Sequence, residues 1–295
     1  MQNVLGAILA LGFAITSAAA APEPPSRPGI DAPELAKLGS FGVGVRTIEL
    51  VDPAQIDVLA FDPATNAAPK RDRTLKVELW YPAVLAAGAN PETYSGSLTA
   101  EPPASPTHFT RSAIAVRDAA AATGRFPLVI VSHGYDNDAV LLSWLTENLA
   151  SKGYVVAAIR HADPPITDGS KFPELLLRRP LDIAFVTRSL RHRLADEGRI
   201  DPSRIALIGY SMGGYGVLTA AGGELDPESP LVKMVPGGLL LPYARGGASS
   251  KSIPVVDVKA VVAISPFGGS LQAWGADGLR AITTPLLLIA GRVVT

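Results

Sequence analysis

The 295-residue sequence contains no cysteine. This absence excludes disulfides, thiolate nucleophiles and cysteine-ligated zinc or iron–sulfur sites. The sequence also has little net charge, since 26 lysines and arginines face 27 aspartates and glutamates, so no strong field favours nucleic acid or an anionic membrane surface. We therefore expect no nucleic-acid partner, and we predict no metal and no cofactor.

Long hydrophobic runs are scarce. The apolar run at residues 4–15 is shorter than the roughly 20 residues that a membrane-spanning helix needs, and small residues follow it at positions 17–21. We interpret residues 1–21 as a secretory signal peptide, which predicts a secreted or periplasmic protein without a stable membrane anchor. Residues 1–5 contain no lysine or arginine, which leaves a buried N-terminal helix as the alternative.

The composition predicts one folded domain after a linker. Residues 22–40 are rich in proline and resemble a tether, whereas 47% of the whole sequence is hydrophobic, which is enough for a large core. We assign residues 41–295 to a single domain, with an insertion rich in proline and glycine at residues 222–254. Residues 86–125 are predicted to form a long loop with at most one short element.

The apolar pattern predicts an α/β fold. Residues 41–51 and 74–81 have the β-rich composition of a leading antiparallel pair. Short apolar runs then alternate with helical patterns, which is typical of a mostly parallel, doubly wound sheet covered on both faces. The predicted strands are residues 127–132, 154–159, 204–208, 258–264 and 285–290, and the predicted helices include residues 142–149, 183–194 and 212–221.

One motif in this pattern carries chemistry. Residues 209–213 have the pattern G-x-S-x-G, with a predicted strand before them and a predicted helix after them. The glycines permit a turn so sharp that the hydroxyl of Ser211 stands at a helix N-terminus, where developing negative charge is stabilised. We therefore predict Ser211 as a nucleophile. The alternative is a tight glycine–serine turn in a protein without enzymatic activity.

An oxyanion hole needs two hydrogen-bond donors near such a serine. We assign them to the backbone amides of Met212 and Tyr135, because Tyr135 follows the first predicted parallel strand. A plain strand-to-helix turn is the alternative for this second segment. The ring of Tyr135 is a candidate contact for an acyl or aromatic group, and His133 is interpreted as structural.

Several segments together resemble the α/β-hydrolase superfamily, among them GRFPLVIVSHGY, DPSRIALIGYSMGGYG, VKAVVAISPFGG and TTPLLLIAG. More narrowly, they resemble bacterial exported proteins grouped with dienelactone hydrolases and platelet-activating-factor acetylhydrolases. The residues around the serine are also similar to secreted polyester hydrolases and cutinase-like lipases. The resemblance implies a serine esterase that forms an acyl-enzyme, acts on a small-molecule or lipid-like ester and requires no protein partner.

The sequence departs from this pattern at the catalytic base. In this fold the chain order is serine, acid, histidine, yet all four histidines, which are His108, His133, His161 and His192, precede Ser211. His161, at the end of a predicted parallel strand, is a less favoured substitute. A hydrogen-bonded structural histidine is the expected interpretation of His161.

The acid is missing as well. Ser265 stands at one position where the resembled families place it, and Asp277 in the following loop is interpreted as a solvated charge. The apolar run at residues 286–289 predicts a strand covered on both faces and paired on both edges, but no strand follows it. We therefore expect that the last strand, its helix, the acid and the histidine are absent from this chain.

Two classes of function follow from these observations. The first is a secreted serine hydrolase of carboxylic esters, impaired here because its acid and histidine are missing. The second is a non-catalytic ligand-binding protein on a hydrolase fold. A polyester or cutinase-like hydrolase is a third possibility that differs from the first only in its substrate.

Overall fold

A computed structural model describes residues 33–98 and 107–291. Residues from Leu38 onward form one compact unit, and the one-turn helix α1 (Pro33–Ala36) belongs to a separate unit. The predicted signal peptide lies outside the described residues. Helix α1 falls within the predicted linker, where Pro33 and Glu34 suit the first turn of a helix.

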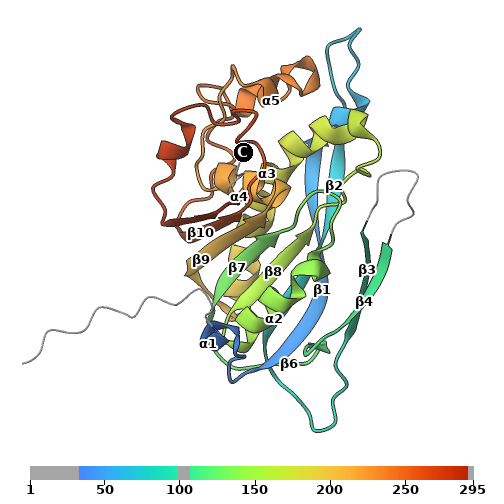
Figure 1. The fold of residues 1–295 in the computed structure, drawn as a ribbon, viewed down its shortest axis with the longest axis vertical. Coiled ribbons are helices and arrows are strands. Elements are labelled where there is room, and N and C mark those ends of the chain that lie inside the picture. The colour runs from blue at the N-terminus through green and yellow to red at the C-terminus, as the bar shows by residue number, and fades with distance from the viewer. Residues whose placement is uncertain (1–32, 99–106, 292–295) are drawn as a thin grey trace, which may run out of the picture. The chain divides into compact units, whose positions relative to one another are not determined.

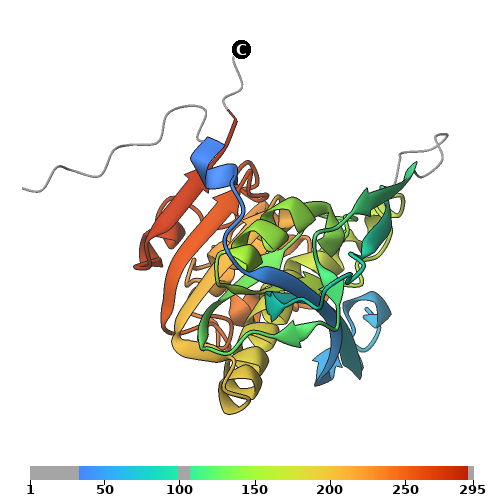
Figure 2. The same cartoon turned by 90° about the horizontal axis from the view of Figure 1, so that it is seen from below.

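The compact unit is organised around one mixed sheet, in which β11, β10, β9, β7 and β8 run parallel and β2 pairs antiparallel with both β8 and β1. Figure 2 shows the strands of the C-terminal part at one edge of the sheet and β1 toward the other. The leading antiparallel pair and the parallel sheet are thus confirmed. In sheet order the strands are β11 (Leu286–Ile289), β10 (Val258–Ile264), β9 (Ile200–Tyr210), β7 (Phe126–Ser132), β8 (Val155–Arg160), β2 (Lys70–Val84), β1 (Gly42–Ile56) and β5 (Val116–Arg117), and β6 (Ala120–Ala121) also pairs with β2.

The sheet separates two hydrophobic clusters, one on each face. In β7, Leu128 and Ile130 belong to the larger cluster, whereas Val129 and Val131 belong to the smaller one. This division follows from the alternation of side chains along a strand. A continuous apolar run such as residues 128–131 is therefore buried on both sides, as the sequence pattern predicts.

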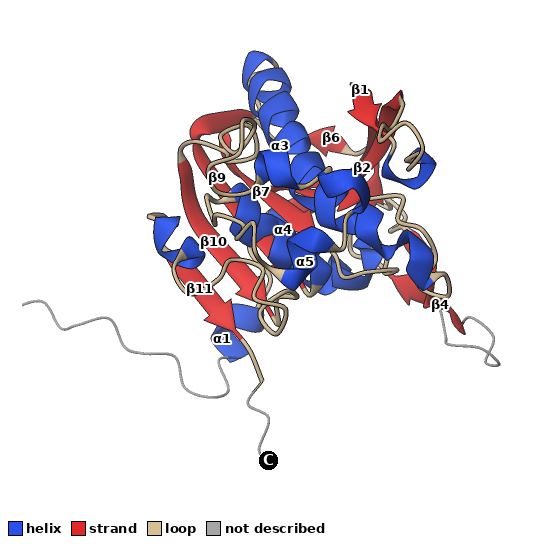
Figure 3. Cartoon of the chain, turned by 90° about the horizontal axis from the view of Figure 1, so that it is seen from above, coloured by secondary structure: helices blue, strands red, loops and turns tan. Residues whose placement is uncertain are grey.

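Helices cover both faces of the sheet. Helices α3 and α4 contact each other and pack on the larger cluster, whereas α2 contributes to the smaller one (Figures 1 and 3). The predicted helix at residues 183–194 is the second half of α3, which begins eleven residues earlier and contains Pro180. None of the helices within the described ranges is long and apolar enough to span a membrane. The helices of the compact unit are α2 (Ser143–Ser151), α3 (Phe172–Asp196), α4 (Met212–Ala220) and α5 (Pro230–Lys233).

The prediction of a long loop at residues 86–125 is wrong. This segment contains β5, β6 and a two-stranded antiparallel sheet of β3 (Thr93–Leu98) and β4 (Thr107–Ser112). Contacts of Tyr94 explain why this segment has a fixed structure. Its buried hydroxyl accepts a hydrogen bond from Trp80 Nε1 (2.7 Å) and donates one to Glu147 Oε1 (2.8 Å). These partners lie outside the segment, so its own composition does not reveal them.

The insertion at residues 222–254 is part of the core. Besides α5 it consists mainly of turns, yet Leu231, Val232 and Leu240 are almost completely buried in the larger hydrophobic cluster. In Figure 1 this segment lies beyond α4 at the upper end of the molecule's compact unit. The proline and glycine content therefore reflects tight turns rather than an unpacked loop.

The apolar run at residues 286–289 lies at one edge of the sheet. The strand forms, but among the described residues it pairs only with β10, and its four side chains are between 39% and 54% exposed. Within the described ranges β11 is thus an exposed apolar edge strand, as expected from the sequence, although its composition is typical of a strand covered on both faces.

Candidate active site

Ser211 occupies the sharp turn between β9 and α4 that the motif predicts. Its φ of 52° and ψ of −114° are unusual for a residue with a side chain and carry strain. The turn is held on both sides, because the Ser211 amide donates to the Ile264 carbonyl (2.9 Å) and the Ser211 carbonyl accepts from the Phe267 amide (2.9 Å). The strained conformation is thus supported by the loop after β10.

The glycines around Ser211 are required by close backbone contacts. A Cβ atom at Gly209 would lie 2.2 Å from the Gly213 carbonyl oxygen, and one at Gly213 would lie 2.0 Å from the Ser132 carbonyl oxygen. Both distances are far below van der Waals contact. The second contact brings the first turn of α4 directly against the end of β7, where the predicted oxyanion loop begins.

The two predicted oxyanion donors lie at the same edge of the sheet as Ser211. Ser132 pairs with Gly209 in neighbouring parallel strands, so Tyr135 and Ser211 both follow the carboxyl ends of these strands. Met212 is the first residue of α4, where a backbone amide has no partner within the helix. Within the described ranges, the amides of Tyr135 and Met212 have no recorded acceptor.

Three half-buried aromatic rings form a row beside this edge. The ring of Tyr135 lies 5.7 Å from that of Phe172, which in turn lies 5.5 Å from the ring of Phe267. The Tyr135 hydroxyl donates to the Pro165 carbonyl (3.2 Å), which fixes the direction of its ring. Because the Phe267 amide also binds the Ser211 carbonyl, the row begins next to the strained turn.

A second serine, Ser132, belongs to a fully buried polar network. Its hydroxyl lies 2.8 Å from Nε2 of His161, whose Nδ1 lies 2.9 Å from a carboxylate oxygen of Asp182. Arg73 donates to both carboxylate oxygens of Asp182, at 2.8 and 2.9 Å. The three side chains of the serine–histidine–aspartate series are at most 1% exposed, so no substrate reaches them in this structure.

The network fixes His161 in a neutral form. Burial and the nearby Arg179 lower the pKa of His161 well below its usual 6.5, and the same causes lower the pKa of His133 to about 4. The carboxylate of Asp182 accepts the Nδ1 proton, which leaves Nε2 to accept from the Ser132 hydroxyl. Both ring nitrogens of His161 are therefore engaged, as expected for a structural histidine, and neither serves Ser211.

Arg179 links this network to the predicted oxyanion loop. Its guanidinium, which is fully buried, donates to the carbonyls of His133 (2.6 Å) and Gly134 (3.1 Å), the two residues before Tyr135. It also pairs with Asp163. Burial raises the pKa of Asp163, but the charge and hydrogen bond of Arg179 together with the neighbouring histidines lower this pKa overall.

Arg179, Asp163 and Arg73 were not among the predicted site residues. A signal for Arg179 exists, because it lies at helical spacing from the apolar residues Leu175 and Ile183. A charged residue that is buried among such residues needs a partner. Arg73 has no comparable signal, since it lies 109 residues before Asp182.

The remaining candidates lie elsewhere. His108 and His192 are exposed, and no histidine in the described ranges has a recorded hydrogen bond to Ser211. Asp277 is a solvated loop charge, as predicted, with a side chain that is 63% exposed and paired with Arg280 (3.0 Å). Among the described residues no group of three or more histidine, aspartate or glutamate side chains is arranged to hold a metal ion.

Sequence comparisons match the segment that contains these elements. Residues 109–233 match the family described as PETase, PET hydrolase-like. The chain is 33% identical over 103 residues to cutinase est1 of Thermobifida alba, covering 35% of this chain and 33% of that protein. It is 35% identical over 101 residues to the bis(hydroxyethyl) terephthalate hydrolase of Streptomyces coelicolor, covering 33% of this chain and 29% of that protein.

The chain thus spans about a third of the length of the curated relatives it matches. A ferulic acid esterase from Streptomyces cinnamoneus aligns in structure with a TM-score of 0.49 and 21% identity, covering 85% of this chain and 65% of that one. The narrower likeness to dienelactone hydrolases and platelet-activating-factor acetylhydrolases stays a prediction. The match to the PET hydrolase-like family over residues 109–233, the mostly parallel sheet and the strand–Ser211–helix turn show that the chain has the α/β-hydrolase fold.

Proposed function

We propose that this chain is a carboxylic-ester hydrolase that uses Ser211 as its nucleophile. The observation that carries the proposal is the strained turn at Ser211, which is enforced by glycines and lies at the N-terminus of α4 within a segment matching the PET hydrolase-like family. Backbone strain of this kind is maintained where function uses it. The names of the matched relatives, a cutinase and a terephthalate ester hydrolase, supply the reaction class.

The proposed reaction has two steps. The Oγ atom of Ser211 attacks the ester carbonyl and loses its proton, the alcohol leaves with a proton, and an acyl-enzyme remains. Water then adds to the acyl carbon, which releases the carboxylic acid and restores the hydroxyl. The amides of Met212 and Tyr135 are assigned to stabilise the negative oxygen formed in each step.

The proton acceptor limits this reaction in the 295-residue chain. A serine hydroxyl is a weak nucleophile until a base removes its proton, and no described histidine is hydrogen-bonded to Ser211. His161 and His133 are buried, and their pKa values are lowered. We therefore expect slow hydrolysis whose rate rises with hydroxide concentration and shows no plateau from a histidine.

The aromatic row favours one class of substrate over others. Tyr135, Phe172 and Phe267 offer apolar surfaces and edges next to Ser211, which suit an ester with an aromatic acyl group. We therefore extend the proposal to aromatic and polyester substrates, and keep lipid-like esters as the competing class. We also propose that the chain is exported, because its sequence begins with an apolar segment that is predicted to be a signal peptide.

Covalent labelling tests the nucleophile directly. The protein is treated with p-nitrophenyl acetate, an activated ester that needs little help to expel its alcohol, and the intact mass and peptide map are recorded. We expect one acetyl group on the peptide that contains Ser211, and no such group in Ser211→Ala. Ser203→Ala, at an exposed position of β9, is the matched control and should acetylate like the wild type.

The same experiment separates the two classes of function. Equal labelling of wild type and Ser211→Ala would contradict the nucleophile assignment. An absence of acetylation in a folded wild-type protein would favour a non-catalytic ligand-binding protein. Comparing p-nitrophenyl benzoate with p-nitrophenyl butyrate then tests the aromatic preference. For each ester the rate of acylation is divided by the rate of its hydrolysis in buffer, and a larger ratio for the butyrate would contradict the preference.

A further inference from the structure

A well-formed pocket lies at the end of the sheet opposite to Ser211. Its lining includes Phe126 and Val155, which are the first residues of β7 and β8. Ser211, in contrast, follows the carboxyl end of β9. A seven-residue strand with a rise of about 3.3 Å per residue separates the two ends by about 20 Å. The pocket is therefore a feature distinct from the candidate active site.

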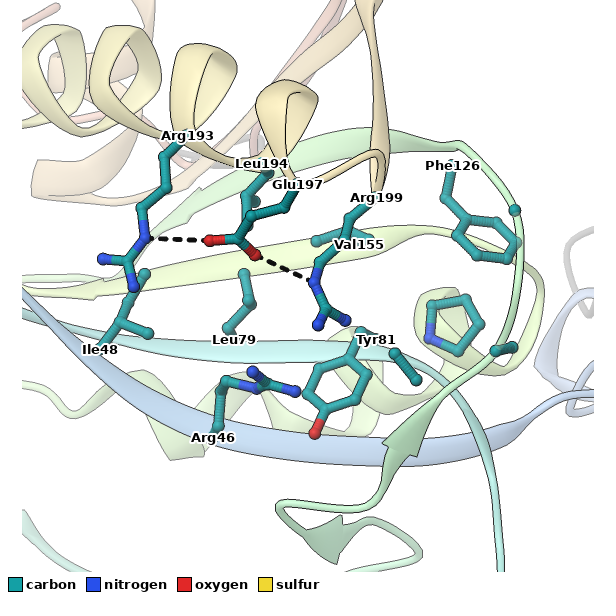
Figure 4. A pocket seen from close by; sticks show the side chains of 14 residues that line it. Arg46, Ile48, Leu79, Tyr81, Phe126, Val155, Arg193, Leu194, Glu197 and Arg199 are labelled. Atoms are coloured by element: carbon teal, nitrogen blue, oxygen red, sulfur yellow. Dashed lines mark hydrogen bonds and ion pairs between the residues drawn. The ribbon is translucent and has the colours of Figure 1, made fainter.

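The walls of the pocket are mostly apolar. Figure 4 shows Ile48 of β1, Leu79 and Tyr81 of β2, Val155 of β8 and Leu194 of α3 around the hollow. The hollow is narrow and opens to solvent at its mouth. Such a surface suits an aromatic ring or a short acyl chain.

The rim of the pocket carries an excess of positive charge. Arg193 and Arg199 share a single carboxylate, that of Glu197, at 3.3 and 3.0 Å (Figure 4). Arg46 is the third arginine in the lining, and within the described ranges it has no ion pair. The lining thus contains three guanidinium groups and one carboxylate. This excess of positive charge makes the pocket complementary to an anion.

Arg46 is also the polar residue of the lining whose side chain most clearly lacks a hydrogen-bond or ion-pair partner within the described ranges. Its guanidinium carbon lies 4.6 Å from the centre of the Tyr81 ring, so its stem and head lie along the apolar wall. Its Nε atom is buried and has no hydrogen-bond partner in the described part of the chain. Because an atom without accessible surface cannot meet a ligand, a ligand carboxylate is assigned to the terminal nitrogens of Arg46, which have no recorded hydrogen bond or ion pair within the described ranges.

We infer that this pocket binds a small organic carboxylate, with its apolar body against Ile48, Leu79 and Val155 and its carboxylate at Arg46. Arg193 and Arg199 add attraction from the opposite wall, since Glu197 neutralises only one of them. The inference concerns binding alone and does not depend on the reaction proposed for Ser211.

Titration calorimetry with benzoate tests the inference. We expect the wild-type protein to bind one benzoate, and Arg46→Gln to bind it at least tenfold more weakly because the charge is lost. Arg280→Gln, which removes an arginine that is 82% exposed on a distant turn, is the matched control and should bind like the wild type. Ser211→Ala should also bind normally, which separates this result from the proposed function.

A second variant keeps the test decisive if Arg46→Gln disturbs folding. Ala122→Phe places a ring in the pocket. The backbone amide of residue 122 donates a hydrogen bond to the Pro82 carbonyl, and this bond does not depend on the side chain. We expect it to abolish benzoate binding. Benzyl alcohol binding as tightly as benzoate, or equal affinities in the wild type and both pocket variants, would overturn the inference.

Discussion

At the residue scale, the close approach of Gly213 to the end of β7 predicts the effect of a single methyl group. Gly213→Ala places its Cβ atom 2.0 Å from the Ser132 carbonyl oxygen, which is backbone and has no freedom to move aside. We expect the free energy of unfolding to decrease by about 1–3 kcal/mol, as for other overpacked sites, and urea denaturation measures it.

The matched control for this change is Gly169→Ala, because no atom lies within 4 Å of the Cβ position at Gly169. This variant should differ from the wild type by less than about 0.5 kcal/mol. Equal stability of the two glycine variants would show that the turn at Ser211 relaxes more easily than its contacts indicate.

Arg179 supplies a second prediction at the residue scale. Arg179→Met leaves the Asp163 carboxylate and the carbonyls of His133 and Gly134 without their buried partner. We expect a loss of about 3–5 kcal/mol in the free energy of unfolding, since removing one member of a buried ion pair leaves an uncompensated charge. Arg179→Lys keeps the charge but not the planar fork, so it should fall between Met and wild type.

Arg280→Met tests whether this effect is specific to the buried network. Its ion pair with Asp277 is largely exposed, and such pairs contribute at most about 1 kcal/mol. Chemical denaturation of all three arginine variants gives the comparison. A loss in Arg179→Met no larger than that in Arg280→Met would contradict the role given to the buried guanidinium.

At the scale of elements, Glu147 on α2 anchors the region of β3 and β4. Its Oε1 accepts from the Tyr94 hydroxyl (2.8 Å) and from the amides of Ile114 (3.1 Å) and Ala115 (3.3 Å). Glu147→Ala removes all three acceptor contacts, so we expect faster hydrogen exchange in residues 93–98 and 107–115. Mass spectrometry of the exchanged peptides measures the change.

Two further variants define the cause of that change. Glu147→Gln retains an acceptor oxygen and should protect these strands better than Glu147→Ala. Glu228→Ala, whose side chain is 82% exposed, should leave their exchange unaltered. Unchanged exchange in Glu147→Ala would mean that the strands are held mainly by other contacts.

The elements also show how far a sequence predicts this fold. The strands β7, β8, β9 and β10 are short apolar runs, and local composition is enough to place them. The strands β3 and β4 were missed because Tyr94 is ordered by Trp80 and Glu147, 14 and 53 residues away. For β11, composition predicts burial, but exposure depends on neighbours that no local pattern specifies.

Part of the candidate site could likewise be predicted from local sequence, and part could not. Ser211 and its glycines lie within one short motif, so the strained turn was predictable. The surroundings of His161 were not, because Arg73 from β2 and Asp182 from α3 reach it across 88 and 21 residues. Only the general expectation of a hydrogen-bonded histidine could be made for His161, and the structure agrees with it.

At the scale of the whole molecule, the two buried histidines predict how stability depends on pH. In the folded protein the pKa of His133 is lowered to about 4 and that of His161 lies well below 6.5. In the unfolded chain both take up protons as the pH falls below about 6.5. The unfolded state therefore binds more protons, and the free energy of unfolding should decrease on acidification from about pH 6.5 toward pH 4.

Each buried histidine contributes a slope of up to about 1.4 kcal/mol per pH unit in this window. Urea denaturation at several pH values measures the total, and His133→Gln should reduce the slope because glutamine does not titrate. His192→Gln, at an exposed position on α3, should leave the slope as it is. An identical slope in His133→Gln and wild type would show that His133 is protonated in the folded protein.

The buried series of Ser132, His161 and Asp182 has one more consequence. Its order and spacing are those sought by any three-dimensional template for hydrolytic serines, and Ser211 has no comparable set of partners among the described residues. A template search on this protein would accordingly select Ser132 and not Ser211, the serine proposed above as the nucleophile. Reactivity toward a dissolved electrophile depends on access as well as on geometry, and here the better-aligned serine is the one that the reagent never meets.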